Sequence, residues 1–181
     1  MKSLLKIIFT IAVISSLFGC KEKQTVEIRT PAEIKEEPQE LPDIADVEFM
    51  DGLIGKVWHI YLEMRMALND HDEDQVQQSA RSMAESFSPD LMNLKSLSLK
   101  LSETEDIEAQ RKIYAQLTQE LGPLFEDALT AGSIYKMYCP LAFNNKGAYW
   151  YADVEETSNP YLDEDHPECR SLEKTITKKS N

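Results

Sequence analysis

Six apolar residues in the second half of the chain recur at helical spacing. They are Ile107, Tyr114, Leu117, Leu121, Leu124 and Ala128, separated by 7, 3, 4, 3 and 4 positions. This spacing puts the side chains on one face of an α-helix, so the segment is predicted to pack that face against a core. Ser102 and Glu105 have the spacing of a capping box that would begin the helix. Gly122-Pro123 is expected to kink or break it near its last turn.

Three earlier segments show the same periodicity. The first runs from Leu53 to Leu68, the second from Val76 to Phe87, and the third carries Leu94, Leu97 and Leu101 after Ser88-Pro89. Proline favours the first position of a helix, and serine favours the position that caps it. Four amphipathic helices joined by short connections predict a mainly α fold, namely a small antiparallel four-helix bundle.

The pattern changes after Gly132. Ser133 to Cys139 and Ala148 to Val154 are rich in aromatic and β-forming residues, and Asn144 to Gly147 between them is a turn sequence. The following chain is irregular and acidic as far as Cys169. We therefore expect a hairpin-like, irregular, cysteine-containing appendage on the bundle.

The first twenty residues have the features of a bacterial lipoprotein signal peptide. Lys2 and Lys6 precede an apolar stretch, Ile7 to Phe18, that is too short to span a bilayer comfortably. The stretch ends in Leu17-Phe18-Gly19-Cys20, which resembles a lipobox. Residues 1–19 are thus predicted to be removed, and Cys20 to carry a lipid that anchors the protein in the cell envelope, in the periplasm or on the outer-membrane surface.

The remaining chain divides into three predicted parts. Residues 20–48 are an acidic tether that contains three prolines, residues 49–175 are the domain, and residues 176–181 are a tail. The whole chain has a formal charge of −13, and the loss of two lysines with the signal peptide makes it more negative. Such a charge repels nucleic acid, which is therefore not an expected partner. The expected contact with the membrane is through the lipid on Cys20.

Sequence motifs for catalysis are lacking. The chain has no nucleophile elbow, phosphate-binding glycine loop or zinc-protease motif, and its three histidines are scattered. Asp70, Asp72 and Asp74 have the opening spacing of a calcium loop, but Gln75 and Arg81 stand where that loop needs glycine and glutamate. We therefore expect a non-enzymatic protein.

Cys139 and Cys169 are the two cysteines left after Cys20. Outside the cytosol, an even number of cysteines favours a disulfide. A bridge across about 30 residues would stabilise the domain by roughly 3–4 kcal/mol in the chain-entropy model. Alternatively, Cys139, His166 and Cys169, with Met137 as an auxiliary ligand, form a set of soft donors suited to Cu(I), while thiolate and imidazole also suit zinc. Both alternatives stay open at this point.

At these residues the sequence resembles a bacterial family called domain of unknown function 3347. The resemblance is carried by Cys139-Pro140-Leu141-Ala142, by Gly147-Ala148 with Trp150, by Asn159-Pro160-Tyr161 and by Cys169. Leu141 and His166 each stand where the family has methionine. Upstream, Ile107-Glu108 with Gln110-Arg111 is similar to a helical segment of the family.

The family occurs in secreted or lipid-anchored proteins and next to periplasmic adaptor subunits of heavy-metal efflux systems. The resemblance therefore implies that this protein binds a soft metal, with copper favoured, and buffers it or transfers it to a metal-efflux or copper-handling partner. The alternative expectation is a protein-interaction module stapled by a Cys139–Cys169 disulfide and holding no metal.

Overall fold

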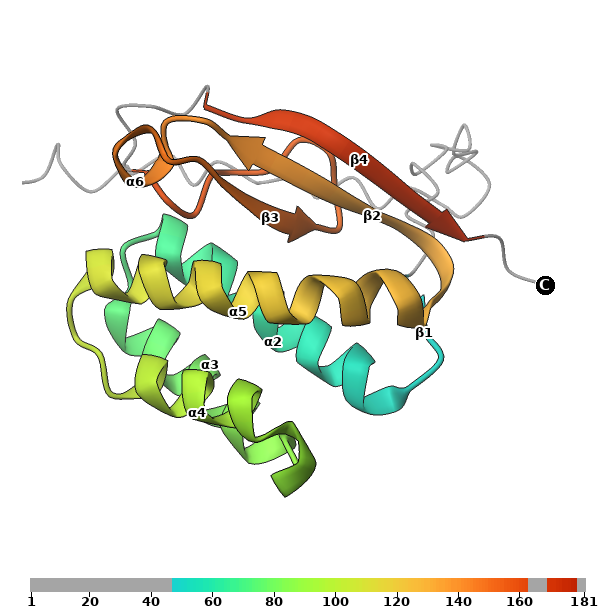
Figure 1. The fold of residues 1–181 in the computed structure, drawn as a ribbon, viewed down its shortest axis with the longest axis horizontal. Coiled ribbons are helices and arrows are strands. Elements are labelled where there is room, and N and C mark those ends of the chain that lie inside the picture. The colour runs from blue at the N-terminus through green and yellow to red at the C-terminus, as the bar shows by residue number, and fades with distance from the viewer. Residues whose placement is uncertain (1–46, 163–168, 179–181) are drawn as a thin grey trace, which may run out of the picture. The chain divides into compact units, whose positions relative to one another are not determined.

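The computed structural model of the chain describes residues 47–162 and 169–178 (Figure 1). The predicted signal peptide, Cys20, nearly all of the predicted tether and His166 lie outside these ranges. The predictions about lipidation and about His166 as a ligand thus concern residues outside the described ranges.

Four α-helices occupy the segments in which apolar periodicity predicts them. They are α2 (Gly52–Asn69), α3 (Glu73–Ser86), α4 (Met92–Ser102), which follows the short 3-10 helix η1 (Pro89–Leu91), and α5 (Ile107–Ala128). Aspartates begin three of them: the Asp51, Asp72 and Asp106 carboxylates accept hydrogen bonds from the backbone N–H groups of the first turns of α2, α3 and α5. The acidic run at positions 70–74 therefore serves to start a helix.

The predicted start of α5 is wrong. Ser102 is the last residue of α4, and its hydroxyl donates to the Leu99 carbonyl, so Asp106 caps α5 in place of the predicted capping box. Helix α5 continues through Pro123 to Ala128, so of the predicted kink or break at Gly122-Pro123 the break does not occur.

The strands make the fold mixed α/β, and the prediction of a mainly α four-helix bundle is wrong. Strand β2 (Leu129–Cys139) follows α5 directly and pairs antiparallel with β1 (Glu48–Phe49), β3 (Ala148–Ala152) and β4 (Ser171–Lys178). The predicted pair of extended segments is confirmed as β2 and β3. It belongs, however, to a four-stranded sheet that forms a full layer of the domain.

The sheet includes residues on either side of the range 49–175 that the sequence predicts for the domain. Glu48, assigned to the tether, pairs with Ala131, and residues 176–178, assigned to the tail, belong to β4. Ile176 is buried opposite Ile134, and the Lys174 ammonium lies 2.5 Å from a Glu126 carboxylate oxygen on α5. These contacts anchor β4, because each removes part of the strand from solvent or ties it to a helix.

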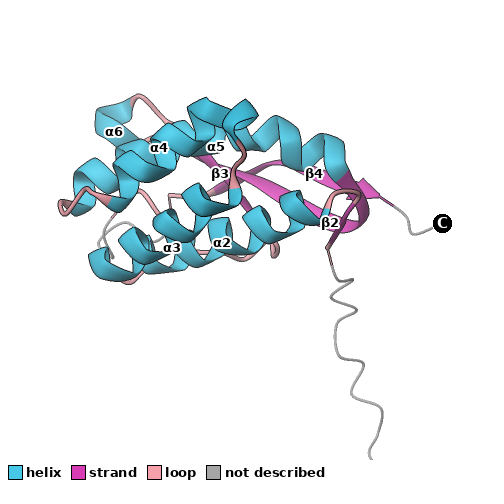
Figure 2. Ribbon diagram, turned by 90° about the horizontal axis from the view of Figure 1, so that it is seen from below, coloured by secondary structure: helices cyan, strands magenta, loops and turns pink. Residues whose placement is uncertain are grey.

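The described domain has three layers, which Figures 1 and 2 show from two sides. The sheet forms one outer layer, α2 and α5 form the middle layer, and α3 and α4 cover the face of these helices that is turned away from the sheet. Helices α2 and α5 bury side chains on both sides, which explains the wide apolar face of α2.

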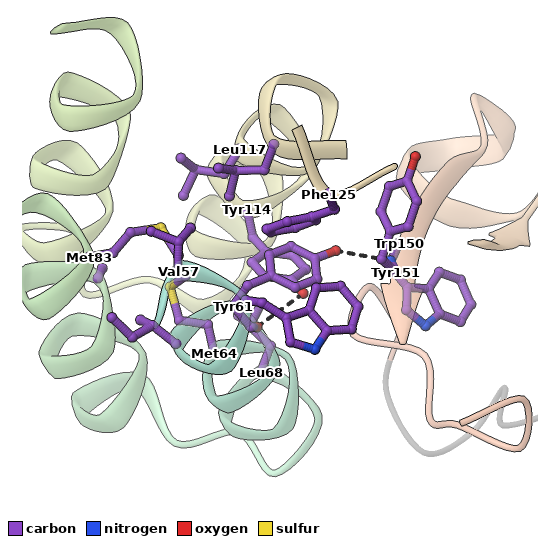
Figure 3. Packing of buried hydrophobic residues seen from close by; sticks show 14 of the residues in the cluster. Val57, Tyr61, Met64, Leu68, Met83, Tyr114, Leu117, Phe125, Trp150 and Tyr151 are labelled. Atoms are coloured by element: carbon purple, nitrogen blue, oxygen red, sulfur yellow. Dashed lines mark hydrogen bonds between the residues drawn. The ribbon is translucent and has the colours of Figure 1, made fainter. Parts of the chain in front are cut away.

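Tyr61 lies where the helices meet the sheet (Figure 3). Its ring stacks on that of Tyr114 at a centroid distance of 4.9 Å and meets the Phe125 ring edge-on at 5.3 Å. Its hydroxyl accepts a hydrogen bond from the Tyr151 backbone N–H of β3, and it lies 3.0 Å from the Thr118 hydroxyl. The Thr118 hydroxyl in turn donates to the Tyr114 carbonyl, which leaves the Tyr61 hydroxyl as donor to Thr118.

Gly122 allows α5 and β3 to approach closely. A Cβ atom at this position would lie 2.7 Å from the ring edge and hydroxyl of Tyr151. Alanine in place of glycine inside a helix normally stabilises it by about 1 kcal/mol. Here we expect the opposite sign: Gly122→Ala should lower the free energy of unfolding by about 1–3 kcal/mol, because it forces the α5–β3 interface apart.

Chemical denaturation monitored by circular dichroism measures this effect. Gly52→Ala is the matched control, because Gly52 begins α2 and nothing lies within 4 Å of an added Cβ there. The control should match the wild type or exceed it slightly. A Gly122→Ala protein at least as stable as the wild type would contradict close packing between α5 and β3 at this position.

Candidate functional site

Cys139 and Cys169 form a disulfide. The bond joins the last residue of β2 to the chain just before β4, and the two Cα atoms lie 5.2 Å apart, within the usual range for a disulfide. The Cys139 side chain is fully buried and Cys169 is half-buried. Of the two alternatives left open by the sequence, the bridge is the one that the structure contains.

Met137 lies on the same strand as Cys139. Residues two positions apart on a strand share a face of the sheet, and both side chains are buried. The opposing residues on β3 are Trp150 for Met137 and Ala148 for Cys139. The structure thus brings together Cys139, Cys169 and the strand that carries Met137, while His166 lies outside the described residues.

The Asn159-Pro160-Tyr161 segment ties the disulfide to the sheet. The Asn159 amide nitrogen donates to the Cys169 carbonyl at 2.8 Å, and its amide oxygen accepts from the Tyr161 backbone N–H at 2.9 Å. The Tyr161 hydroxyl donates to the Tyr149 carbonyl of β3 at 2.8 Å. Burial raises the pKa of Tyr161 well above its ordinary value, so this hydroxyl stays protonated and keeps its role as donor.

Arg111 anchors the same segment to α5. Only 1% of this residue is exposed, and its Nε donates to the Pro160 carbonyl at 3.2 Å. The rest of the guanidinium pairs with the Glu108 carboxylate and contacts a ring nitrogen of His71. Sequence reasoning included Arg111 in a helical segment but gave it no role. The sequence signal that could have identified Arg111 as a buried residue is its position four residues after Ile107, on the face that the helix buries.

The turn between β2 and β3 has an unusual backbone. It contains the four-residue element α6 (Ala142–Asn145), in which Phe143 and Asn144 are left-handed, and Asn145 also has a positive φ. Asparagine tolerates this conformation better than most residues. Gly147 has a φ of +78°, and the Tyr138 ring occupies the space that a Cβ would need. Glycine is therefore required at position 147 both for its positive φ and because a side chain would overlap the Tyr138 ring.

Trp150 packs in the core next to Tyr161. It is fully buried and meets the Tyr161 ring edge-on at a centroid distance of 5.9 Å. Gly147, Trp150, Asn159 and Tyr161, which carry much of the family resemblance, thus all have structural roles around the disulfide.

The oxidised site is unsuited to a metal ion. Each sulfur is bonded to the other, so neither cysteine offers the thiolate that a soft metal binds. Within residues 47–162 and 169–178, no three or more histidine, cysteine or acidic side chains are grouped so as to hold a metal ion. Over the same ranges, no helix has the length and apolar character needed to cross a membrane.

Comparisons with protein-family models, curated proteins and solved structures found no match to this chain. The resemblance to the domain of unknown function 3347 therefore rests on the motif residues alone and stays a prediction.

Removal of the disulfide should destabilise the domain markedly. The cysteines are 30 residues apart, so the chain-entropy model gives a loss of about 3–4 kcal/mol for the double variant Cys139→Ala/Cys169→Ala. Alanine is chosen because Cys139 is buried, and a serine hydroxyl there would add a desolvation cost of its own. Urea denaturation measures the free energy of unfolding.

The wild-type protein in reductant is the second arm of this experiment. It should unfold at a lower urea concentration than the oxidised protein. For the double variant, the urea midpoint should be the same with and without reductant. Identical wild-type midpoints with and without reductant would show that the bridge does not stabilise the fold.

Proposed function

We propose that this protein is a lipid-anchored, disulfide-stapled module of the cell envelope that acts by binding a partner and not by catalysis. The observation that carries the proposal is the Cys139–Cys169 disulfide. Disulfides persist in oxidising compartments, such as the periplasm or the cell surface. This agrees with the destination predicted from the signal peptide and from Cys20.

The roles of the buried polar residues support a non-enzymatic function. Arg111, Asn159 and Tyr161 are engaged in hydrogen bonds that hold the segment before Cys169. A catalytic site needs a nucleophile, acid or base free to meet a substrate. The polar side chains around the disulfide are instead used to fix the backbone.

Cell fractionation and intact mass test this proposal together. The wild-type protein should be in the membrane fraction, and Cys20→Ala should be soluble outside the cytosol, because it cannot accept the lipid. The Cys20→Ala protein, purified without reductant, should be about two daltons lighter than the same protein after reduction, as expected when two thiol hydrogens are lost. Wild-type protein in the soluble fraction would contradict the lipid anchor. Quantitative labelling of the thiols of Cys139 and Cys169 without reductant would contradict the disulfide.

Metal binding by the reduced form is our second proposal. In it, the free thiolates of Cys139 and Cys169 bind a soft metal, with Cu(I) favoured and zinc as the other candidate, for buffering or transfer to an efflux partner. The position of Met137 on the same buried strand face as Cys139 supports it, because a thioether and a thiolate on one face suit Cu(I). His166 is the proposed imidazole ligand. Oxidation would abolish this site, since a bridged sulfur is no longer a thiolate.

A bathocuproine competition titration tests the second proposal. Reduced wild-type protein should withdraw Cu(I) from the chelator, Cys139→Ser should do so at least about tenfold less well, and Met137→Leu should show a smaller loss. Oxidised wild-type protein is the control and should not compete. Equal, weak competition by reduced wild type and Cys139→Ser would refute metal binding at this site.

A further inference from the structure

A pocket lies between the first turns of α5 and the turn that joins β2 to β3. Figures 1 and 2 show α6 and the beginning of α5 at the same end of the domain. The pocket has a volume of about 620 Å³, which is within the range of small-molecule sites. We call it the Lys112–Lys146 pocket, after a lysine on each of these two segments. Neither cysteine of the disulfide lines it, and nor does Met137.

The two lysines of this pocket lack an acidic partner. Both side chains are exposed and line the cavity. Among the ion pairs formed by the described residues, none includes Lys112 or Lys146. The Glu108 carboxylate also lines the pocket, but it pairs with Arg111. Two uncompensated positive charges therefore meet at one cavity, in a chain whose formal charge is −13.

Two asparagines lie beside Lys146 in the same pocket. Asn144 and Asn145 have positive φ angles of 59° and 65°, and their side chains are exposed. Residues in such sparsely populated backbone conformations are concentrated at functional sites, including segments that hold a ligand. Each side-chain amide can donate two hydrogen bonds. The turn therefore offers amide donors next to a positive charge, which is a combination that suits an oxyanion.

One wall of the pocket is apolar. It consists of Leu141, which is 46% exposed, and of Phe143 and Leu162, which are half-buried. The Phe143 ring packs against that of Tyr161 at a centroid distance of 5.2 Å, which holds this wall in place. Covering exposed apolar surface is favourable, so the best ligand has an apolar group in addition to its charge.

The number of lysines restricts the charged group of the ligand. A carboxylate carries one negative charge and would compensate only one of the two ammonium groups. A phosphate monoester carries between one and a half and two negative charges at pH 7, together with three acceptor oxygens. Lysine binds phosphate as a point charge and does not need the fork geometry of arginine. The two lysines and the neighbouring amides therefore match a phosphate monoester best.

We propose that the Lys112–Lys146 pocket binds a phosphate monoester that carries an apolar group. The two ammonium groups pair with the phosphate oxygens, the Asn144 and Asn145 amides donate to the same oxygens, and the apolar group lies against the apolar wall. A soluble organic phosphate and a lipid with a terminal phosphate both present this chemistry. Binding at this pocket requires no metal and no free thiol.

Calorimetric titration of the soluble Cys20→Ala protein, purified without reductant, tests the proposal. The probes at pH 7.5 are phenyl phosphate, inorganic phosphate and phenylacetate. Phenyl phosphate should bind at least about tenfold more tightly than phenylacetate, which has one charge fewer, and severalfold more tightly than inorganic phosphate, which has no apolar group. It should also shift the backbone amide NMR signals of Asn144 and Asn145. Equal affinity for phenyl phosphate and phenylacetate, or unshifted signals from this turn, would overturn the proposal.

Exposed lysines provide a matched pair of variants. Lys112→Gln/Lys146→Gln should weaken phenyl phosphate binding at least about tenfold. Lys56→Gln/Lys100→Gln changes the net charge by the same amount at two exposed lysines outside the pocket, and its affinity should equal that of the parent protein. Equal losses in the two double variants would show general attraction of an anion to lysines, and the pocket would then not be a site.

The asparagines are tested by substitution with glycine. Glycine adopts a positive φ without strain, so Asn144→Gly/Asn145→Gly removes both amide groups and allows the same backbone conformation. Phenyl phosphate binding should weaken severalfold, with little change in the urea midpoint. Unchanged affinity would contradict the role of the two amides as donors.

Vesicle cosedimentation identifies the source of the phosphate. Phosphatidic acid has a terminal phosphate monoester, whereas phosphatidylglycerol is an anionic phosphate diester. Binding of the Cys20→Ala protein to vesicles that contain phosphatidic acid but not to those that contain phosphatidylglycerol, with loss in Lys112→Gln/Lys146→Gln, would identify a lipid. Phenyl phosphate binding without cosedimentation would identify a soluble organic phosphate.

Discussion

The hydrogen bond from the Tyr151 N–H to the Tyr61 hydroxyl joins the helical layers to the sheet. A backbone N–H at the edge of β3 would otherwise be buried without a partner, at a cost of about 1–3 kcal/mol. Burial also raises the pKa of Tyr61, which keeps its hydroxyl protonated as the donor to Thr118. Because one hydroxyl serves both α5 and β3, the middle helices and the sheet have a defined relative position.

The hydrogen bonds around the disulfide depend on this position of the sheet against the helices. Once β3 is fixed by Tyr61, the Tyr161 hydroxyl can cap the Tyr149 carbonyl, and Asn159 can reach the Cys169 carbonyl. Arg111 adds a contact from α5 to Pro160. The Cys139–Cys169 bond therefore closes a region that three side-chain hydrogen bonds also hold. The disulfide therefore stabilises the fold. Any metal binding by the two cysteines would require the reduced protein.

Local sequence patterns predicted the helices well and the sheet poorly. Residues such as Tyr114, Leu117 and Leu121 repeat at helical spacing, and all three are buried. Strand β4 gives no comparable signal, because only Ile176 among its eight residues is buried. Its pairing with β2 depends on a strand more than 30 positions earlier in the chain, which no short window of sequence contains. The four-helix bundle was therefore a reasonable prediction that long-range pairing overturned.

The sequence by itself determined the helical segments, the turn that requires Gly147 and the two cysteines that could meet. Each of these depends on residues close together in the chain, where spacing and backbone conformation decide the structure. Only the tertiary structure decided that Cys139 and Cys169 are bonded, that β4 belongs to the sheet, and that Arg65 and Arg111 are buried. Those outcomes depend on partners tens of residues away, such as Thr157 for Arg65 and Pro160 for Arg111. The burial of a charged side chain is stable only when the folded chain brings such partners to it.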